Sequence, residues 1–335
     1  MNSRRCDLRL GLALCVLLSS AGCSPATSGD SETAAVVPGD ESASRTGELA
    51  TADPFARGYT HDDFPRVTRI APDVYTWEQL RSAGDEWFTT VSLFVVGDEG
   101  VLVADGQGTL TETTRLVAYI DSVHALPVTD LVIGSDHGDH TAGNAAFPEG
   151  LRIYAHPRSD AALRQAGHAP ATHLISDRET LDFGPQRVDI AFLGPAHTGG
   201  DLVVHLPDAG VLFMSEAFLH RVFPAMRSAC PSEWVRMVER AQALQPVIPV
   251  PGHGFVDAPP VLVDELEEFR QALVTVVAEG RRLHEAGLDI DAALEQADFG
   301  ELTNWSLAAG QAPIALRQIY AELEGRLQCE AFGQN

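Results

Sequence analysis

A ten-residue polar stretch constrains this chain more than any other part of its sequence. The run Ser-Asp-His-Gly-Asp-His-Thr-Ala-Gly-Asn occupies residues 135–144 and follows the apolar run 131–133 and a glycine, a pattern that predicts a buried strand ending in a loop. His137, Asp139 and His140 lie within four residues of one another. Each would need a polar partner if it were buried in a core. Because a metal ion supplies such partners, the stretch predicts a metal site.

Composition and charge narrow the class of protein. The chain has 335 residues, and 45% of them are hydrophobic, which is enough for a large core. Its 23 basic residues face 47 acidic ones, for a formal net charge of −24. Nucleic-acid binding draws most of its affinity from neutralisation of phosphates by lysine and arginine. We therefore expect no nucleic-acid partner.

The N-terminus has the features of an export signal. Residues 1–22 combine two early arginines with an apolar segment too short to span a bilayer, and small residues lead to Cys23. This pattern resembles a bacterial lipoprotein signal, which is cleaved so that the cysteine is acylated. The alternative is ordinary secretion with cleavage nearby. Both place the protein outside the cytoplasm, and the first predicts a lipid anchor on Cys23 at the periplasmic side of a membrane.

The remaining chain divides into a tether and one domain. Residues 23–60 are rich in small and acidic side chains without an apolar period, which predicts a disordered tether. We expect the domain at 61–335, with C-terminal helices from about residue 257 at 261–286, 290–297 and 315–327. Cys230 and Cys329 could pair in an oxidising compartment, and the sequence leaves that pairing open.

Three further motifs each follow a predicted strand. His197 lies in Gly-Pro-Ala-His-Thr-Gly-Gly-Asp, where small residues let the backbone approach a ligand closely. Glu216 ends the apolar run that begins at residue 211. His253 lies in Pro-Gly-His-Gly after the apolar run 247–250.

Together the motifs resemble those of the metallo-β-lactamase superfamily. The stretch 135–144 is similar to its His-x-His-x-Asp-His signature, except that Ser135 stands at the first histidine. The motifs around His197, Glu216 and His253 follow in the superfamily's order. The resemblance implies an α/β fold, namely a four-layer αβ/βα sandwich of two mostly antiparallel or mixed sheets with helices outside.

The resemblance also implies a ligand set. The first metal site would consist of His137 and His197 with Ser135 as a weakened ligand, because a hydroxyl binds zinc far less well than imidazole. The second site would consist of three residues, and Glu216 would bridge the two sites where the superfamily usually has aspartate. The second-site residues are Asp139, His140 and His253.

The number of metals stays open at this point. One metal could occupy the second site, two could bind with Glu216 and water completing the first site, or none could bind tightly. Zinc is the expected cofactor, and the same ligands accept iron or manganese.

Other residues receive roles by the same resemblance. Asp105, at the end of a predicted strand, would orient the ligand loop without binding the metal itself. Trp87 lies in a hairpin that leans over the metal site in relatives. His220 and Arg227 follow Glu216 in a loop expected at the pocket mouth, where arginine could hold an anion.

The implied function is hydrolysis. A metal of this kind generates a nucleophile from water at neutral pH, and Asp139 would orient that water as the catalytic residue. We expect a metal-dependent hydrolase of a small ester, lactone, amide or β-lactam-like substrate outside the cytoplasm. The alternative is a non-catalytic binding or accessory lipoprotein that kept the fold while its metal site degraded.

Overall fold

The computed structural model describes residues 51–327 and 329. The predicted signal at 1–22, Cys23 and most of the predicted tether lie outside the described residues. Within the described part of the chain, no helix has the length and apolar character needed to cross a membrane.

Seven strands form the first sheet, in chain order across it. Neighbours from β1 to β4 pair antiparallel, and neighbours from β4 to β7 pair parallel. The strands are β1 (Arg66–Ala71), β2 (Val74–Ala83), β3 (Glu86–Val96), β4 (Val101–Ala104), β5 (Val128–Val132), β6 (Arg152–Ala155) and β7 (His173–Leu174).

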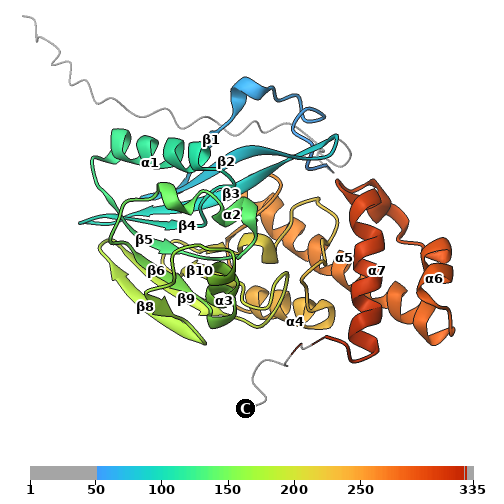
Figure 1. The fold of residues 1–335 in the computed structure, drawn as a ribbon. Coiled ribbons are helices and arrows are strands. Elements are labelled where there is room, and N and C mark those ends of the chain that lie inside the picture. The colour runs from blue at the N-terminus through green and yellow to red at the C-terminus, as the bar shows by residue number, and fades with distance from the viewer. Residues whose placement is uncertain (1–50, 328, 330–335) are drawn as a thin grey trace, which may run out of the picture. The chain divides into compact units, whose positions relative to one another are not determined.

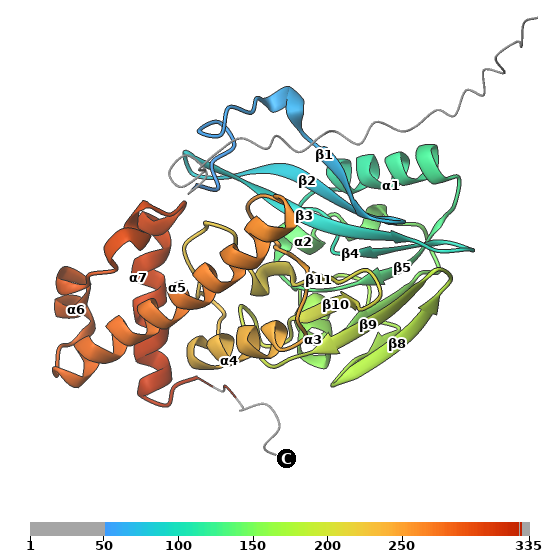
Figure 2. The ribbon, with the colours of Figure 1, turned by 180° about the vertical axis from the view of Figure 1, so that it is seen from behind.

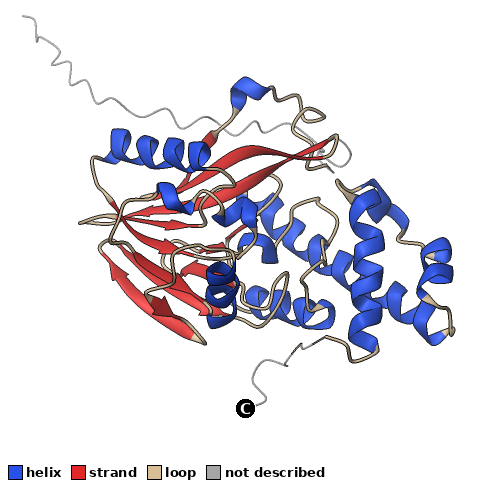
Figure 3. Ribbon diagram, in the orientation of Figure 1, coloured by secondary structure: helices blue, strands red, loops and turns tan. Residues whose placement is uncertain are grey.

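Five strands form the second sheet, in the order β12-β11-β10-β9-β8. Only β11 and β12 pair parallel. The strands are β8 (Arg178–Phe183), β9 (Gln186–Phe192), β10 (Leu202–Leu206), β11 (Val211–Phe213) and β12 (Ile248–Val250). Figure 3 shows the two sheets facing each other with helices outside them.

Helices cover the outer faces of both sheets. Helix α1 lies over the first sheet, and α5, α6 and α7 gather on one side of the sandwich in both views (Figure 1 and Figure 2). The helices are α1 (Leu110–His124), α2 (Gly138–Thr141), α3 (Pro157–Gln165), α4 (Pro231–Gln242), α5 (Pro259–Glu285), α6 (Ile290–Gln296) and α7 (Ala308–Leu323). Short 3-10 helices lie at η1 (His61–Asp63), η2 (Asn144–Ala146), η3 (Ser215–Ala217) and η4 (Gly300–Asn304).

The hydrophobic core follows the alternation of side chains along the strands. On β3, Phe94 packs outward against Leu116 of α1, whereas Leu93 packs inward against Phe213 of the second sheet. The outer face of the second sheet packs against α4, α5 and α7, with Phe269 among the buried residues. The order helix, sheet, sheet, helix confirms the predicted four-layer αβ/βα sandwich.

The ordered region begins earlier than the sequence predicts. Residues 51–60 belong to the expected tether, yet Ala52 is fully buried and Arg57 forms a bidentate pair with Asp257 at 3.0 and 3.1 Å. The guanidinium of Arg57 also lies over the ring of Phe255. Composition suggested disorder, but these few long-range contacts hold the segment against the domain.

The last helix also begins earlier than predicted. We expected it at 315–327, whereas α7 spans Ala308–Leu323 and contains Pro313. Proline lacks an N–H donor and disfavours a helix interior, so the sequence argues for a later start. Burial of Ala315, Leu316 and Ile319 against neighbouring helices outweighs that local preference.

Candidate metal centre

The site lies where strand ends from both sheets meet. The parallel strands β4 and β5 end next to Asp105 and next to the loop that leads into α2. In the second sheet, β9, β11 and β12 run in one direction and are followed by His197, Glu216 and His253. Each candidate ligand therefore follows a buried strand that fixes its position.

The predicted ligands form two groups that share one carboxylate. Within each group, ligand atoms lie within 4.8 Å of one another. One group contains His137, His197 and Glu216, and the other contains Asp139, His140, Glu216 and His253. This division is the one the sequence resemblance implied.

Glu216 occupies the middle of the cluster. Its Oε2 lies 3.0 Å from Nδ1 of His137, and its Oε1 lies 3.0 Å from Nε2 of His197 and 3.1 Å from Nε2 of His253. Ser135 is fully buried, and its hydroxyl donates a hydrogen bond to Oε2. Ser135, which stands where the superfamily signature has its first histidine, therefore contacts Glu216.

The second group is equally compact. Oδ2 of Asp139 lies 3.3 Å from Nε2 of His253 and 3.9 Å from Nε2 of His140. Nδ1 of His253 donates to the carbonyl of Thr89 at 3.0 Å, so its Nε2 faces the cluster. Metal-ligating histidines typically donate their other ring N–H to a carbonyl or carboxylate in this way.

The donor set fits a divalent cation. Nε2 of His197 lies 3.0 Å from Nδ1 of His137, and the Nε2 atoms of His140 and His253 lie 3.5 Å apart. A neutral imidazole has one lone-pair nitrogen and one N–H, so converging ring nitrogens are satisfied by a proton or a metal ion. Imidazole with carboxylate suits zinc, and it also accepts iron or manganese.

Asp105 links the ligand loop after β5 to the 3-10 helix η3 after β11. Its Oδ2 lies 3.0 Å from Nδ1 of His140 and accepts a hydrogen bond from the Ser215 hydroxyl, while its Oδ1 accepts the N–H of Gly134 at 2.7 Å. Its φ of 61° is left-handed, a conformation that costs energy for a residue other than glycine. Gly134 is required nearby, since a Cβ there would lie 2.6 Å from Cβ of Ser215.

The pKa values of His137, His140 and His253 are raised, whereas burial lowers that of His197. Burial disfavours charged His137, but the Glu216 carboxylate outweighs this cost and raises the pKa of His137 to about 9. Burial is likewise outweighed at His253, where hydrogen bonds to Asp139 and Glu216 raise the pKa to about 10. Although burial favours its neutral form, the neighbouring imidazoles bring the pKa of Glu216 well below its usual range. A metal entering the cluster must therefore displace protons.

Comparison with known proteins finds relatives among the metallo-β-lactamases. No family model matches the chain. A metallo-β-lactamase, IND-1 of Chryseobacterium indologenes, is 24% identical over 209 residues, which cover 60% of this chain and 86% of that protein. The type 2 metallo-β-lactamase of Bacillus sp. (strain 170) is 22% identical over 60% of this chain and 80% of its own length. The solved metallo-β-lactamase from Pontibacter korlensis has the same fold, with a TM-score of 0.57 and 20% identity over 62% of this chain and 98% of its own.

The chain is similar to metallo-β-lactamases in sequence and in fold. The cluster of candidate ligands lies at the edge of the sandwich where the strands that precede the predicted motifs end.

Two predicted substrate contacts lie elsewhere in the superfamily fold. Trp87 packs against Phe55 and His61 of the N-terminal segment, on the face of β3 opposite the metal centre. The next residue, Phe88, contacts the ring of His253 instead. The hairpin was located correctly, but the alternation along β3 directs Phe88, and not Trp87, toward the site.

The second misplaced contact is His220. Its ring is buried, donates from Nδ1 to the carbonyl of Phe255 at 2.7 Å, and lies 3.5 Å from a carboxylate oxygen of Glu265. The prediction that it sits at the pocket mouth is wrong, because the chain after η3 turns inward to pack against α5. His220 is therefore part of a buried polar network.

Arg227 does lie near the centre. It is exposed, its positive charge acts on His137, and the hydroxyl of neighbouring Ser228 lies 3.3 Å from Nε2 of His137. The side chain of Asp139 is 30% exposed and that of His137 is 13% exposed. The centre is thus open to solvent beside the loop that carries Arg227.

Sequence reasoning missed several residues that support the centre. Ser228, Phe88, Thr89 and Ser215 each contact a ligand or Asp105. None lies in a recognisable motif, since each comes into contact only through strand pairing or loop packing. Only Phe88 had a usable signal, which was its alternation with Trp87 along a predicted strand.

Proposed function

We propose that the protein is a metal-dependent hydrolase of small molecules. The single observation that carries this proposal is the pair of ligand groups, His137 with His197 and Asp139 with His140 and His253, joined by Glu216. Groups of this composition occur in hydrolytic metal centres that keep an open position for substrate.

The residues have distinct roles in this proposal. A bound divalent ion would supply Lewis-acid chemistry, since it would lower the pKa of water toward neutrality and polarise the bond to be cleaved. Asp139 is the most exposed carboxylate of the cluster, and it orients water and accepts its proton. Asp105 and Thr89 fix the rings of His140 and His253.

The substrate class follows from the open side of the centre. Arg227 and Ser228 lie on the exposed loop beside His137, where a guanidinium can pair with a carboxylate of the substrate. We propose a small ester, lactone, amide or β-lactam-like substrate, and zinc as the metal, with iron or manganese as substitutes.

We also propose that the protein acts outside the cytoplasm, anchored through lipid on Cys23. The sequence pattern of residues 1–23 supports export. The bond between Cys230 and Cys329 adds support, because disulfides persist mainly in oxidising compartments. Cells making wild type should incorporate labelled fatty acid into the protein, whereas Cys23→Ser should abolish the label. Equal labelling of both would contradict the anchor.

Activity of the full-length chain tests the hydrolase proposal. The purified protein is stripped with a chelator, reloaded with zinc, iron or manganese, and assayed on chromogenic esters, lactones, amides and β-lactams. Reloading should restore hydrolysis, and His253→Ala should lower kcat/KM at least 100-fold, whereas His168→Ala, which replaces a histidine outside the cluster, should not. Metal binding without hydrolysis of any substrate class would favour the non-catalytic accessory protein.

A further inference from the structure

The two departures from the superfamily pattern touch each other. Ser135 replaces the first histidine of the signature, and Glu216 replaces the usual aspartate. They are 81 positions apart in sequence, yet the Ser135 hydroxyl donates directly to Oε2 of Glu216. Both side chains are buried, with Ser135 at 0% and Glu216 at 3% exposure.

The hydrogen bonds of Ser135 fix its orientation. Its Oγ accepts the N–H of His137 at 3.3 Å, and its hydroxyl proton goes to Glu216. Its own N–H points to Oδ1 of Asp105 at 3.4 Å. The hydroxyl is thus held between a ligand loop and the Glu216 carboxylate.

Size explains why the two residues occur together. A serine side chain is far smaller than an imidazole, and glutamate is one methylene longer than aspartate. The added length brings the carboxylate of Glu216 to within 3.0 Å of both His137 and His197. Since interiors are closely packed, an imidazole at position 135 would compete with this carboxylate for space.

We propose that Ser135 positions Glu216 as the third ligand of the first metal site, in place of the missing histidine. His137, His197 and Glu216 then form a site of two imidazoles and one carboxylate. This inference rests on the proposed metal-dependent function and specifies its first metal site. Both ligand groups now offer two imidazoles with carboxylate, a set that suits iron and manganese better than three imidazoles do.

Metal affinity of four variants tests this coupling. Zinc binding to full-length protein is measured by competition with a chromophoric chelator, and the number of ions per chain by native mass spectrometry. The variants are Ser135→Ala, Ser135→His, Glu216→Asp, and the double variant Ser135→His with Glu216→Asp. Ser92→Ala is the matched control, because Ser92 is also fully buried but bonds to Gly106 and Gln107 outside the cluster.

We expect wild type to bind two ions per chain. Ser135→Ala should weaken the first site 10- to 100-fold and leave the second unchanged, as loss of an orienting partner does. Each of Ser135→His and Glu216→Asp should weaken the first site, and the double variant should bind more tightly than either single variant. Ser92→Ala should bind as wild type, and thermal unfolding identifies any variant that fails to fold.

Three results would overturn the inference. The first is a Ser135→Ala variant that binds both ions as tightly as wild type. The second is a double variant in which the effects of the single variants simply add. The third is a wild type that binds only one ion, which would leave the proposed hydrolase intact. Failure of wild type to bind zinc, iron or manganese at all would instead remove the proposed function itself.

Discussion

Glu78 is a carboxylate that the fold buries at an energetic cost. It lies on β2 with a fully buried side chain, and the nearest cation is the Arg66 guanidinium at 3.3 Å. Desolvation outweighs this partner and raises the pKa of Glu78 from 4.5 to about 7. Above the ordinary pKa of glutamate, the Glu78 carboxyl is therefore still protonated in the folded protein while it is ionised in the unfolded chain.

This pKa determines how stability changes with pH. Between about pH 4.5 and 7 the folded state binds more protons at Glu78 than the unfolded state, so the free energy of unfolding falls as pH rises. The difference in pKa corresponds to roughly 3 kcal/mol. Glu78→Gln should remove this contribution, so wild type should lose roughly 2.5 kcal/mol more stability than the variant between pH 5 and 8.

Urea unfolding at several pH values measures the effect. Glu99→Gln, a change at an exposed position, is the control and should leave the pH dependence as in wild type. Parallel pH profiles for wild type and Glu78→Gln would contradict the assignment.

At the scale of elements, the N-terminal segment braces the loop that carries His253. Arg57 pairs with Asp257 and lies over Phe255, and Tyr59 stacks on the same ring at 5.3 Å between centroids. Phe255 and Asp257 lie on this loop, within four residues of His253. The segment therefore connects to the metal centre although it contributes no ligand.

Arg57→Ala should destabilise the protein. The Arg57 side chain is 3% exposed and that of Asp257 is 13% exposed, so the change leaves a carboxylate without its main cation in a largely buried place. The expected loss is about 3 kcal/mol in the free energy of unfolding by urea. Arg69→Ala removes a guanidinium that is 56% exposed and 3.9 Å from its partner, and it should cost far less. Equal losses for the two variants would contradict the bracing role.

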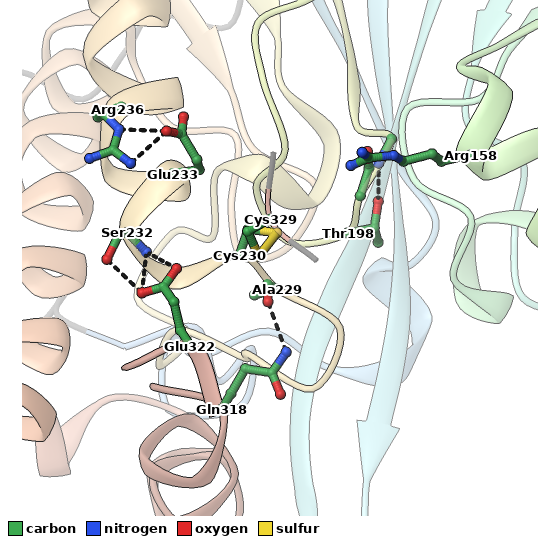
Figure 4. Close-up of a disulfide and its surroundings, with 12 residues drawn as sticks. Arg158, Thr198, Ala229, Cys230, Ser232, Glu233, Arg236, Gln318, Glu322 and Cys329 are labelled. Atoms are coloured by element: carbon green, nitrogen blue, oxygen red, sulfur yellow. Dashed lines mark hydrogen bonds and ion pairs between the residues drawn. A yellow bond between two sulfur atoms is a disulfide. The ribbon is translucent and has the colours of Figure 1, made fainter. Parts of the chain in front are cut away.

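A disulfide secures the other side of the centre. Cys230 and Cys329 join the start of α4 to the chain after α7, with Cα atoms 5.6 Å apart. Figure 4 shows Gln318 and Glu322 of α7 beside the disulfide, where Gln318 donates to the Ala229 carbonyl and Glu322 accepts from Ser232 in the first turn of α4. The loop just before this bond carries Arg227 and Ser228.

Cys329→Ser should lower stability by about 4 kcal/mol, because the bond closes a loop of 99 residues and limits the unfolded chain. Urea unfolding with and without a reducing agent measures this. Wild type should lose its advantage on reduction, and the variant should be unaffected by it. A variant as stable as oxidised wild type would show that the bond contributes nothing.

At the scale of the whole molecule, the sequence predicted the architecture because it is set by local patterns. The apolar runs before His137 and His253 predicted buried strands, and the order of the motifs predicted the four-layer sandwich. The ligand set followed, since each ligand comes directly after such a strand.

What the sequence could not predict depends on contacts distant along the chain. The burial of Arg57 against Asp257 and the inward turn of His220 follow from packing between separate elements. The contact between Ser135 and Glu216 also depends on the fold. The motif shows only that serine replaces a histidine, whereas the structure shows that Glu216 lies against this serine. Trp87 was misassigned because motif position does not determine which face of a strand meets the site.

The cluster around Glu216 should hold metal, and the number of ions per chain can be measured directly. Full-length protein is purified, dialysed gently and subjected to elemental analysis, with Ser92→Ala as a matched sample. We predict about two ions of zinc, iron or manganese per chain in both. A protein that retains no ion, even after zinc is added back, would contradict the account.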